Sequence, residues 1–276
     1  MKILSCGAGM QSTALALMSA ENVKKGIIYP EVPIYDAIIF CDLNCEPPWV
    51  YSQVDFIASV CKQYGIPFYI LDSFIFEDHA QRVQNGKFIK IPFWTMNDGK
   101  RGKLQRTCTT DYKIVIIQQF VKYNLLGYKK RQRIKQEDIG AHEMHIGFSF
   151  EEQKRTSESR HPMFVTKFPL VKMGLERKDS YKYVLEEWGL ETKASACYIC
   201  PFHKNYFFKY LQENYPNEYE AVTDFDRILE EKSKTGAVKS DLYITYSCKR
   251  INELTKADCD DAEYFTYRGK QIWNGF

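Results

Sequence analysis

Two cysteines in the C-terminal third of the chain, Cys197 and Cys200, have a spacing that lets two thiolates reach one metal ion or iron–sulfur cluster. They lie in the stretch "CYICP", where a proline follows the second cysteine. The same spacing occurs in redox dithiols and in pairs of unrelated core cysteines, and a thioredoxin-like site would require its own small βαβ fold. The chain has nine cysteines, an odd number that favours reduced thiols over a disulfide framework.

A second group of residues that can do chemistry lies near the N-terminus, in "KILSCGAGMQSTALALM". Glycines between a strand and a helix let the backbone curl around phosphate oxygens, and the N–H groups at the helix start favour an anion. The spacing matches neither the dinucleotide fingerprint nor the Walker loop, and a tight turn without a ligand is the alternative interpretation. The candidate phosphate-binding residues are Ser5, Cys6, Gly7, Ala8, Gly9, Gln11, Ser12 and Thr13.

Acidic residues follow the second predicted strand. Asp42 and Glu46 come directly after "AIIFC", at the carboxyl end of that strand. A carboxylate in this position can bind a ribose hydroxyl or a magnesium ion. For Glu46 the alternative is a cap on the helix that follows.

Charged residues also surround two later elements. The stretch "GKLQRTCTTDYKI" places Arg106, Cys108 and Lys113 around a helix start, and "IGFSFEEQKR" places Glu151 and Arg155 four residues apart just after a strand. On an α-helix that spacing makes an ion pair that stabilises by only about 0.2–0.5 kcal/mol. We therefore interpret Arg155 as a phosphate ligand held in place by Glu151.

Hydrophobic periodicity predicts the elements that position these residues. Alternating strands and helices of this length imply a parallel sheet covered on both faces. We expect an α/β domain over 1–190 and a smaller, mostly helical region over 191–276 that contains the Cys-x-x-Cys pair. The predicted strands are 2–4, 37–41, 66–71 and 144–149, the predicted helices are 12–20, 49–64, 111–123 and 179–188, and 75–105 reads as a long irregular loop.

Taken in order, these motifs resemble the phosphoadenosine phosphosulfate (PAPS) reductase family of adenine nucleotide alpha hydrolase-like proteins, over about Lys2 to Arg227. The nearest likeness is to its phage- and mobile-element-type branch, which includes reductase-like proteins associated with some CRISPR loci. The N-terminal loop resembles the PP-loop, Ser-Gly-Gly-x-Asp-Ser, with Gln11 where many relatives have Asp and Cys6 where Gly is commoner. The resemblance implies a Rossmann-like core that binds ATP or a related adenine nucleotide with Mg²⁺, and it adds Gly147 and Glu151 to the nucleotide-binding residues.

The resemblance also suggests a metal site. Iron–sulfur relatives that reduce adenosine phosphosulfate (APS) have a Cys-Cys pair, a lysine four residues later and a Cys-x-x-Cys. Here Cys108 matches the first cysteine, Thr109 replaces the second and Lys113 matches the lysine. Three thiolates with one open iron also resemble the [4Fe–4S] arrangement of PP-loop tRNA thiolases. The alternatives are structural Zn²⁺, with His203 as the fourth ligand beside Cys108, Cys197 and Cys200, or no metal, and Cys6 is either inert or able to reach the site.

The activity that the resemblance implies is cleavage of ATP between its α and β phosphates, with Lys113 and Arg155 as catalytic residues. Cleavage would either adenylate a substrate or release AMP and pyrophosphate, and a cluster would favour sulfur transfer to RNA or DNA. A sulfonucleotide reductase is the first alternative, but the tail "AEYFTYRGKQIWNGF" lacks the Glu-Cys-Gly-x-His segment that carries the catalytic thiol of those enzymes. The second alternative is a non-catalytic nucleotide-binding subunit of a defence complex.

Composition limits the possible partners and location. The formal charge of +3 is too small to indicate nucleic-acid binding by itself, but "KKRQRIK" at 129–135 has five basic residues in seven. This loop is either a solvated surface or a contact for RNA or DNA phosphates. No window is apolar enough for a membrane span and no signal peptide is evident, so we expect a cytoplasmic protein, either a homodimer or bound to a defence-complex partner.

Overall fold

The computed structural model describes residues 1–87, 89–232 and 240–273. The chain divides into two compact units, each assembled from several stretches. The sheet unit comprises Met1–Cys41, Trp49–Leu71 and Ile116–Ser195. The thiol unit, named for the cysteines described below, comprises Asp42–Pro48, Asp72–Val115 and Ala196–Phe276.

The sheet unit contains a five-stranded parallel sheet, which confirms the expected α/β class. The strand order is β3-β2-β1-β6-β7, with β1 in the centre. Leu4 of β1 lies opposite Ile38 of β2 on one side and His145 of β6 on the other. The bounds are β1 (Lys2–Cys6), β2 (Ala37–Asp42), β3 (Phe68–Asp72), β6 (His142–Ile146) and β7 (Phe164–Lys167).

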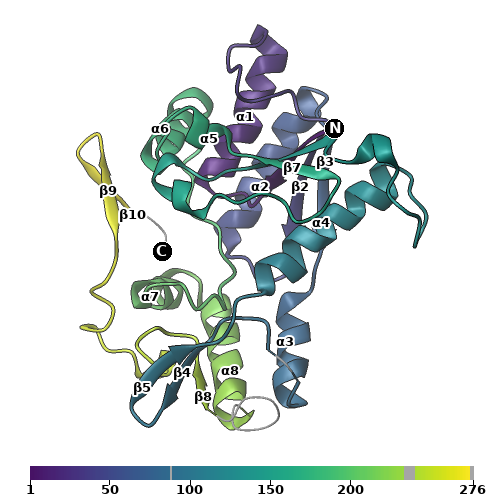
Figure 1. The fold of residues 1–276 in the computed structure, drawn as a ribbon. Helices are drawn as coiled ribbons and strands as arrows, with labels where there is room; N and C mark the ends of the chain where they lie inside the picture. Colours follow the sequence, from purple (N-terminus) through teal and green to yellow (C-terminus); the bar gives the residue numbers. More distant parts are fainter. Residues whose placement is uncertain (88, 233–239, 274–276) are drawn as a thin grey trace. The chain divides into compact units, whose positions relative to one another are not determined.

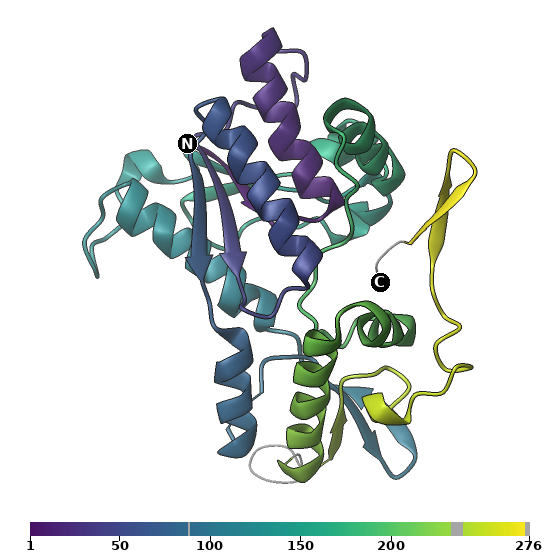
Figure 2. The ribbon, with the colours of Figure 1, turned by 180° about the vertical axis from the view of Figure 1, so that it is seen from behind.

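Helices cover both faces of this sheet (Figures 1 and 2). Helices α1 and α2 lie over one face and α4 lies over the other, while α6 packs against α1. Turns of π-helix precede and follow α4, at Thr110–Ile114 and Val121–Leu125. The bounds are α1 (Met10–Lys25), α2 (Pro48–Gln63), α4 (Val115–Phe120), α5 (Pro169–Lys172) and α6 (Arg177–Trp188), and a 3₁₀ turn spans Phe150–Arg155.

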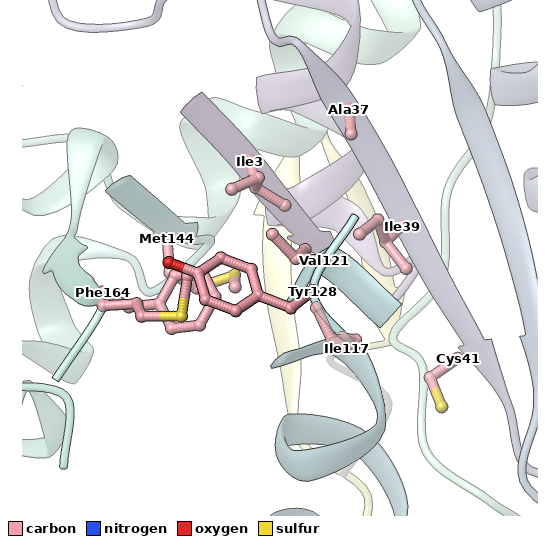
Figure 3. Close-up of a cluster of buried hydrophobic side chains, with 10 residues drawn as sticks. Ile3, Ala37, Ile39, Cys41, Ile117, Val121, Tyr128, Met144 and Phe164 are labelled. Atoms are coloured by element: carbon pink, nitrogen blue, oxygen red, sulfur yellow. The ribbon is translucent and has the colours of Figure 1, made fainter. Parts of the chain in front are cut away.

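The core on the α4 side shows why these segments form their elements (Figure 3). Alternate residues of the central strands, such as Ile3 and Ile39, face the buried side chains of Ile117 and Val121 from the helical segment. A period of two on the strands and of four on the helix brings both apolar faces together. Tyr128 closes the cluster, and its hydroxyl donates to the carboxylate of Asp138.

The thiol unit contains helices and short antiparallel strands. Helix α3 (Ile75–Gln84) and the hairpin β4 (Trp94–Asn97) and β5 (Lys100–Lys103) occupy the stretch predicted to be an irregular loop, so that prediction is wrong. Strand β8 (Asp241–Tyr243) extends the hairpin on the β4 side. The remaining elements are α7 (Asn205–Asn214), α8 (Pro216–Lys232), β9 (Tyr264–Tyr267) and β10 (Lys270–Trp273).

Among the described residues, no helix is both long and apolar enough to span a membrane.

Candidate nucleotide loop and thiol cluster

The glycine loop lies where the order of the sheet reverses. Strand β1 has β2 on one side and β6 on the other. The chain continues from β1 toward β2 and from β6 toward β7, in opposite directions across the sheet, so the ends of β1 and β6 lie at a topological switch point. Open α/β sheets bind ligands at the carboxyl ends of the strands at such a point. Cys6 is the last residue of β1 and Met10 the first of α1, while Gly147 directly follows β6. The topology therefore brings two of the predicted nucleotide-binding segments to one edge of the sheet unit.

The backbone of the loop has an unusual conformation. Ala8 has φ +53°, in the left-handed region that a residue with a Cβ seldom adopts. Gly9 is the N-cap of α1 with an extended backbone, and no described side chain caps the helix there. The first N–H groups of α1 thus retain capacity for an anion, because a helix start normally needs side-chain or ligand acceptors.

At two positions the backbone comes so close to a neighbouring residue that only glycine fits. A Cβ on Gly147 would lie 2.9 Å from the backbone nitrogen of Ser12, so only glycine lets the end of β6 approach the first turn of α1 this closely. A Cβ on Gly9 would lie 2.9 Å from Oγ of Ser195. Ser195 therefore packs on the loop, a contact that the sequence did not predict.

Gln53 on α2 holds the loop in place, although no sequence motif points to it. Its side chain is buried, and Nε2 donates to the carbonyl oxygens of Ala8 and, at 3.2 Å, of Lys193. Its Oε1 accepts from the backbone N–H of Lys193 at 2.6 Å. Trp49, one turn earlier on α2, donates from Nε1 to the carbonyl of Ala194 at 3.0 Å. The sequence signal that could have identified Gln53 is its position four residues after Trp49, on the same buried face of a predicted helix.

Glu152 is the centre of the charges beside the loop. Its Oε2 accepts from Nε2 of Gln11 at 3.0 Å and from the hydroxyl of Ser149 at 3.1 Å. Arg155 pairs with Glu152 and lies over the ring of Phe148, and a second guanidinium, that of Arg177, lies 3.8 Å from the same carboxylate. Because four charged or polar side chains converge on it, Glu152 determines how this corner is ordered.

The expected Glu151–Arg155 pair does not form. The segment is a 3₁₀ turn, in which residues three apart share a face, so Arg155 meets Glu152 instead. Glu151 accepts from the backbone N–H of Arg177 at 3.0 Å. The predicted roles of Glu151 and Arg155 toward a nucleotide remain predictions.

Other predicted nucleotide ligands have the following positions. Asp42 ends β2, and its Oδ1 accepts from the N–H of Asn44 at 2.8 Å. Ser5 lies in β1, and the buried thiol of Cys6 lies within the sheet unit. Thr13 is fully buried in α1, and its Oγ1 has no hydrogen-bond partner among the described residues.

The thiols of Cys108, Cys197 and Cys200 gather in the thiol unit. The thiols of Cys197 and Cys200 shift each other's pKa, and Cys108 interacts electrostatically with Cys200. A fourth thiol, that of Cys45, and the thiol of Cys197 also shift each other's pKa. Within the described residues, no three His, Cys, Asp or Glu side chains are already arranged as a metal site.

Burial keeps these thiols protonated. It raises the pKa of Cys45 and of Cys108, and the hydrogen bond to Cys197 together with burial raises that of Cys200. His203, the predicted zinc ligand, is buried and stacks on Phe207 with ring centres 3.4 Å apart. Its Nε2 lies 3.0 Å from the carbonyl oxygen of Cys197, and burial lowers its pKa to about 3. The imidazole is therefore neutral and donates to that carbonyl.

Lys113 pairs with Glu46 in the same unit. Its Nζ lies 3.1 Å from Oε1 of Glu46, whose side chain is fully buried. Both groups act electrostatically on Cys45. Lys113 thus lies near the thiols, where its charge can offset that of thiolates.

The basic loop at 129–135 belongs to the sheet unit. Lys129, Lys130, Arg131 and Arg133 are exposed, and Lys135 pairs with Glu137 at 3.4 Å. Arg131 has φ +67°, so the chain turns sharply in the middle of the loop.

Comparisons with known proteins give a distant likeness. No protein-family model matches the chain, and no curated protein matches it. Among solved structures, it is similar to the U34-tRNA thiolase NcsA from Methanococcus maripaludis with its [4Fe-4S] cluster, at 16% identity and a TM-score of 0.41. The likeness covers 83% of this chain and 72% of that chain.

Proposed function

We propose that the chain binds ATP or a related adenine nucleotide at the Ser5–Thr13 loop and cleaves it between the α and β phosphates. The observation that carries this proposal is the approach of Gly147 to the first turn of α1, beside a helix start that no described side chain caps. Gly147 lets the backbone after β6 come close to the start of α1, and the N–H groups there can donate to an anion. Such a place suits a phosphate group.

The residues of the loop suit a leaving pyrophosphate. Backbone N–H groups from the left-handed Ala8 to the first turn of α1 would donate to its oxygens, with the hydroxyl of Ser12 beside them. Gln53 and Ser195 hold the loop in this shape before any ligand binds. Pre-organised donors stabilise developing charge without having to reorient during the reaction.

In the reaction, an oxygen of the acceptor or of water attacks the α phosphorus and forms the new P–O bond. The bond from that phosphorus to the bridging oxygen breaks, its electron pair leaves with pyrophosphate, and the acceptor's proton passes to solvent. Arg155, held by Glu152, would offset charge on the phosphates. The roles of Lys113 and of Asp42, as a ribose or Mg²⁺ ligand, remain predictions.

The thiols suggest what the activation is for. The donor set fits a thiophilic metal, because Cys108 and Cys197 each interact with Cys200, and Lys113 acts electrostatically on the neighbouring Cys45. A [4Fe–4S] cluster there would supply a site for sulfur, and a Zn²⁺ would supply structural stabilisation. We propose Cys108, Cys197 and Cys200 as ligands and sulfur transfer to RNA or DNA as the purpose.

The test measures pyrophosphate release from ATP by the purified chain, together with nucleotide binding by calorimetry. Binding and release are expected in wild type, and both are expected to fall in Gly9→Ala, whose new methyl would meet Ser195. Binding without release would favour the nucleotide-binding subunit, and sulfite release from PAPS with thioredoxin would favour the reductase. Absence of nucleotide binding would contradict the proposal.

A further inference from the structure

Cys45 lies in a turn that the backbone attaches to the Cys-x-x-Cys segment. The turn follows β2, and Asn44 within it has φ +55°. The carbonyl oxygen of Cys45 accepts from the N–H of Tyr198, between the paired cysteines, at 2.8 Å. This hydrogen bond joins residues far apart in the sequence and places Cys45 beside the Cys-x-x-Cys turn. The thiol of Cys45 is buried, and it interacts with that of Cys197.

The Cys-x-x-Cys turn is well ordered before any ligand binds. The N–H of Cys200 donates to the carbonyl of Cys197 at 2.9 Å, and His203 donates its own N–H to the carbonyl of Cys200 at 3.3 Å. With the backbone oxygens occupied in this way, the thiols of the turn are the groups left to meet a ligand. They interact with each other, and Cys197 interacts with Cys45 as well, so the pairwise interactions form a row.

Cys108 reaches the other end of the row from the start of the π-helical segment. Its N–H and that of Thr107 both donate to the carbonyl of Lys90 at 3.1 Å, which fixes the residue in place. The thiols thus follow one another as Cys45, Cys197, Cys200 and Cys108, from three separate stretches of the chain.

A buried carboxylate beside Cys45 gives an independent indication of a ligand. Glu46 is 2% exposed, and its Oε1 pairs with Lys113. Its Oε2 is buried and has no hydrogen-bond partner among the described residues. Buried polar atoms are nearly always satisfied, so an unsatisfied carboxylate oxygen within electrostatic range of Cys45 and Cys197 indicates a ligand at this site.

We propose that Cys45 is the fourth thiolate of the metal site, which completes a set with Cys108, Cys197 and Cys200 around one thiophilic centre, Zn²⁺ or a [4Fe–4S] cluster. Without metal the thiols interact in pairs. A bound metal would bring all four around one centre. Cys45 would take the place of the cysteine that the iron–sulfur relatives have where this chain has Thr109. His203 would stay hydrogen-bonded to the carbonyl of Cys197. The inference rests on the thiol ligands proposed above but not on ATP cleavage. A cluster held by four thiolates leaves no iron open for sulfur, so the inference replaces sulfur transfer as the purpose of the site.

The test measures iron, sulfide and zinc in anaerobically purified protein, and metal affinity by competition with a chromophoric chelator. Cys45→Ser keeps the size of the side chain and is expected to lower the affinity at least about tenfold. Cys61→Ser is the matched control, because Cys61 is equally buried but lies on α2 in the sheet unit, and it should retain wild-type metal content. Iron with sulfide would identify a cluster, and zinc alone a single ion.

A second measurement uses the wild-type chain and does not depend on how the variants fold. Thiols are alkylated with and without a chelator, and each cysteine is quantified by mass spectrometry. Protection of Cys45 together with Cys197 and Cys200, lost on chelation, is the expected result. Equal labelling of Cys45 in both states, or a protein that binds no metal, would overturn the inference even where ATP is cleaved.

Discussion

The side-chain amide of Gln11 donates a hydrogen bond of 3.0 Å to Oε2 of Glu152. The PP-loop that this chain resembles has an aspartate at the position of Gln11, so a carboxylate is absent from the loop itself. Through this hydrogen bond Glu152, in the 3₁₀ turn after β6, supplies a carboxylate beside the loop, and the same carboxylate pairs with Arg155. The carboxylate is thus present beside the loop but comes from a different segment.

Replacing Glu152 by glutamine should separate binding from turnover. The amide keeps a hydrogen bond to Gln11 but removes the ion pair that orders Arg155. Pyrophosphate release should fall about tenfold, while nucleotide affinity, set by backbone donors, should change less than about threefold. Glu158→Gln, an exposed carboxylate in the same segment, is the control. A large loss of affinity with unchanged release would contradict the role given to Glu152.

Gly147→Ala should weaken nucleotide binding by about tenfold or more. Its methyl would lie 2.9 Å from the backbone nitrogen of Ser12, so the first turn of α1 would have to move. Overpacking of this kind costs about 1–3 kcal/mol. The matched control is Gly102→Ala in the β4–β5 hairpin, where a Cβ would lie 2.7 Å from Oγ1 of Thr95. Calorimetry with ATP and thermal unfolding of both variants distinguish lost binding from lost stability, and equal ATP affinity in the two would contradict this prediction.

Acid should destabilise the thiol unit through His79. Burial lowers the pKa of His79 to about 4, from 6.5, and its ring bonds the carbonyl of Ile75 and the N–H of Lys90. In the unfolded chain His79 binds a proton below about pH 6.5, whereas in the folded chain it does so only below about pH 4. The free energy of unfolding therefore falls as the pH drops through this window. The difference is on the order of 3 kcal/mol.

Urea unfolding at several pH values checks this expectation. His79→Gln should be less stable at pH 7, because it loses a buried imidazole, but it should lose less stability between neutral and acid pH than wild type does. His203, whose pKa is also lowered by burial, leaves a residual slope. An unchanged slope in His79→Gln would show that other groups control the acid response.

The basic loop should show its purpose in the salt dependence of binding to nucleic acid. Alanine at Lys129, Lys130, Arg131 and Arg133 should weaken binding to single-stranded RNA or DNA, and each lost phosphate contact should flatten the log–log salt slope by about 0.7. Lys24→Ala with Lys62→Ala removes exposed charge elsewhere as a control. Fluorescence anisotropy measures both, and wild-type protein that binds no nucleic acid at low salt would show that the loop is only a solvated surface.

Four strands of the sheet could be predicted from the sequence because they are short apolar runs next to helices with clear ends. Strand β7, which is short and contains Thr166 and Lys167, was not predicted. Helix α6 ends at Gly189, whose φ of +69° is the conformation that favours glycine at a helix end. The hairpin β4–β5 was predictable too, since Asp98 and Gly99 both have positive φ, as a tight two-residue hairpin turn requires. We expected a loop there because the flanking strands carry lysine, arginine and asparagine in place of apolar alternation.

Helix α3 and the fourth thiol were beyond the reach of local patterns. The buried face of α3 consists of Ile75, His79 and Val83, and a histidine in the middle of two apolar residues leaves too weak a period to recognise. Cys45 meets Cys197 through a contact between distant stretches, and no spacing rule relates the two. The Glu151–Arg155 expectation failed for a local reason, because it assumed an α-helix where the chain forms a 3₁₀ turn.

The division of the chain has a consequence for heredity. The thiol unit comes from Asp42–Pro48, Asp72–Val115 and Ala196–Phe276, with pieces of the sheet unit encoded between them. Cys45, Cys108 and the Cys197–Cys200 pair each belong to a different one of these stretches. This unit cannot be exchanged as one contiguous cassette without parts of the sheet unit, and a crossover between Cys45 and Cys108 or between Cys108 and Cys197 would bring together cysteines of different ancestry. Keeping the four thiols from one parent therefore means inheriting the intervening stretches of the sheet unit, Trp49–Leu71 and Ile116–Ser195, with them.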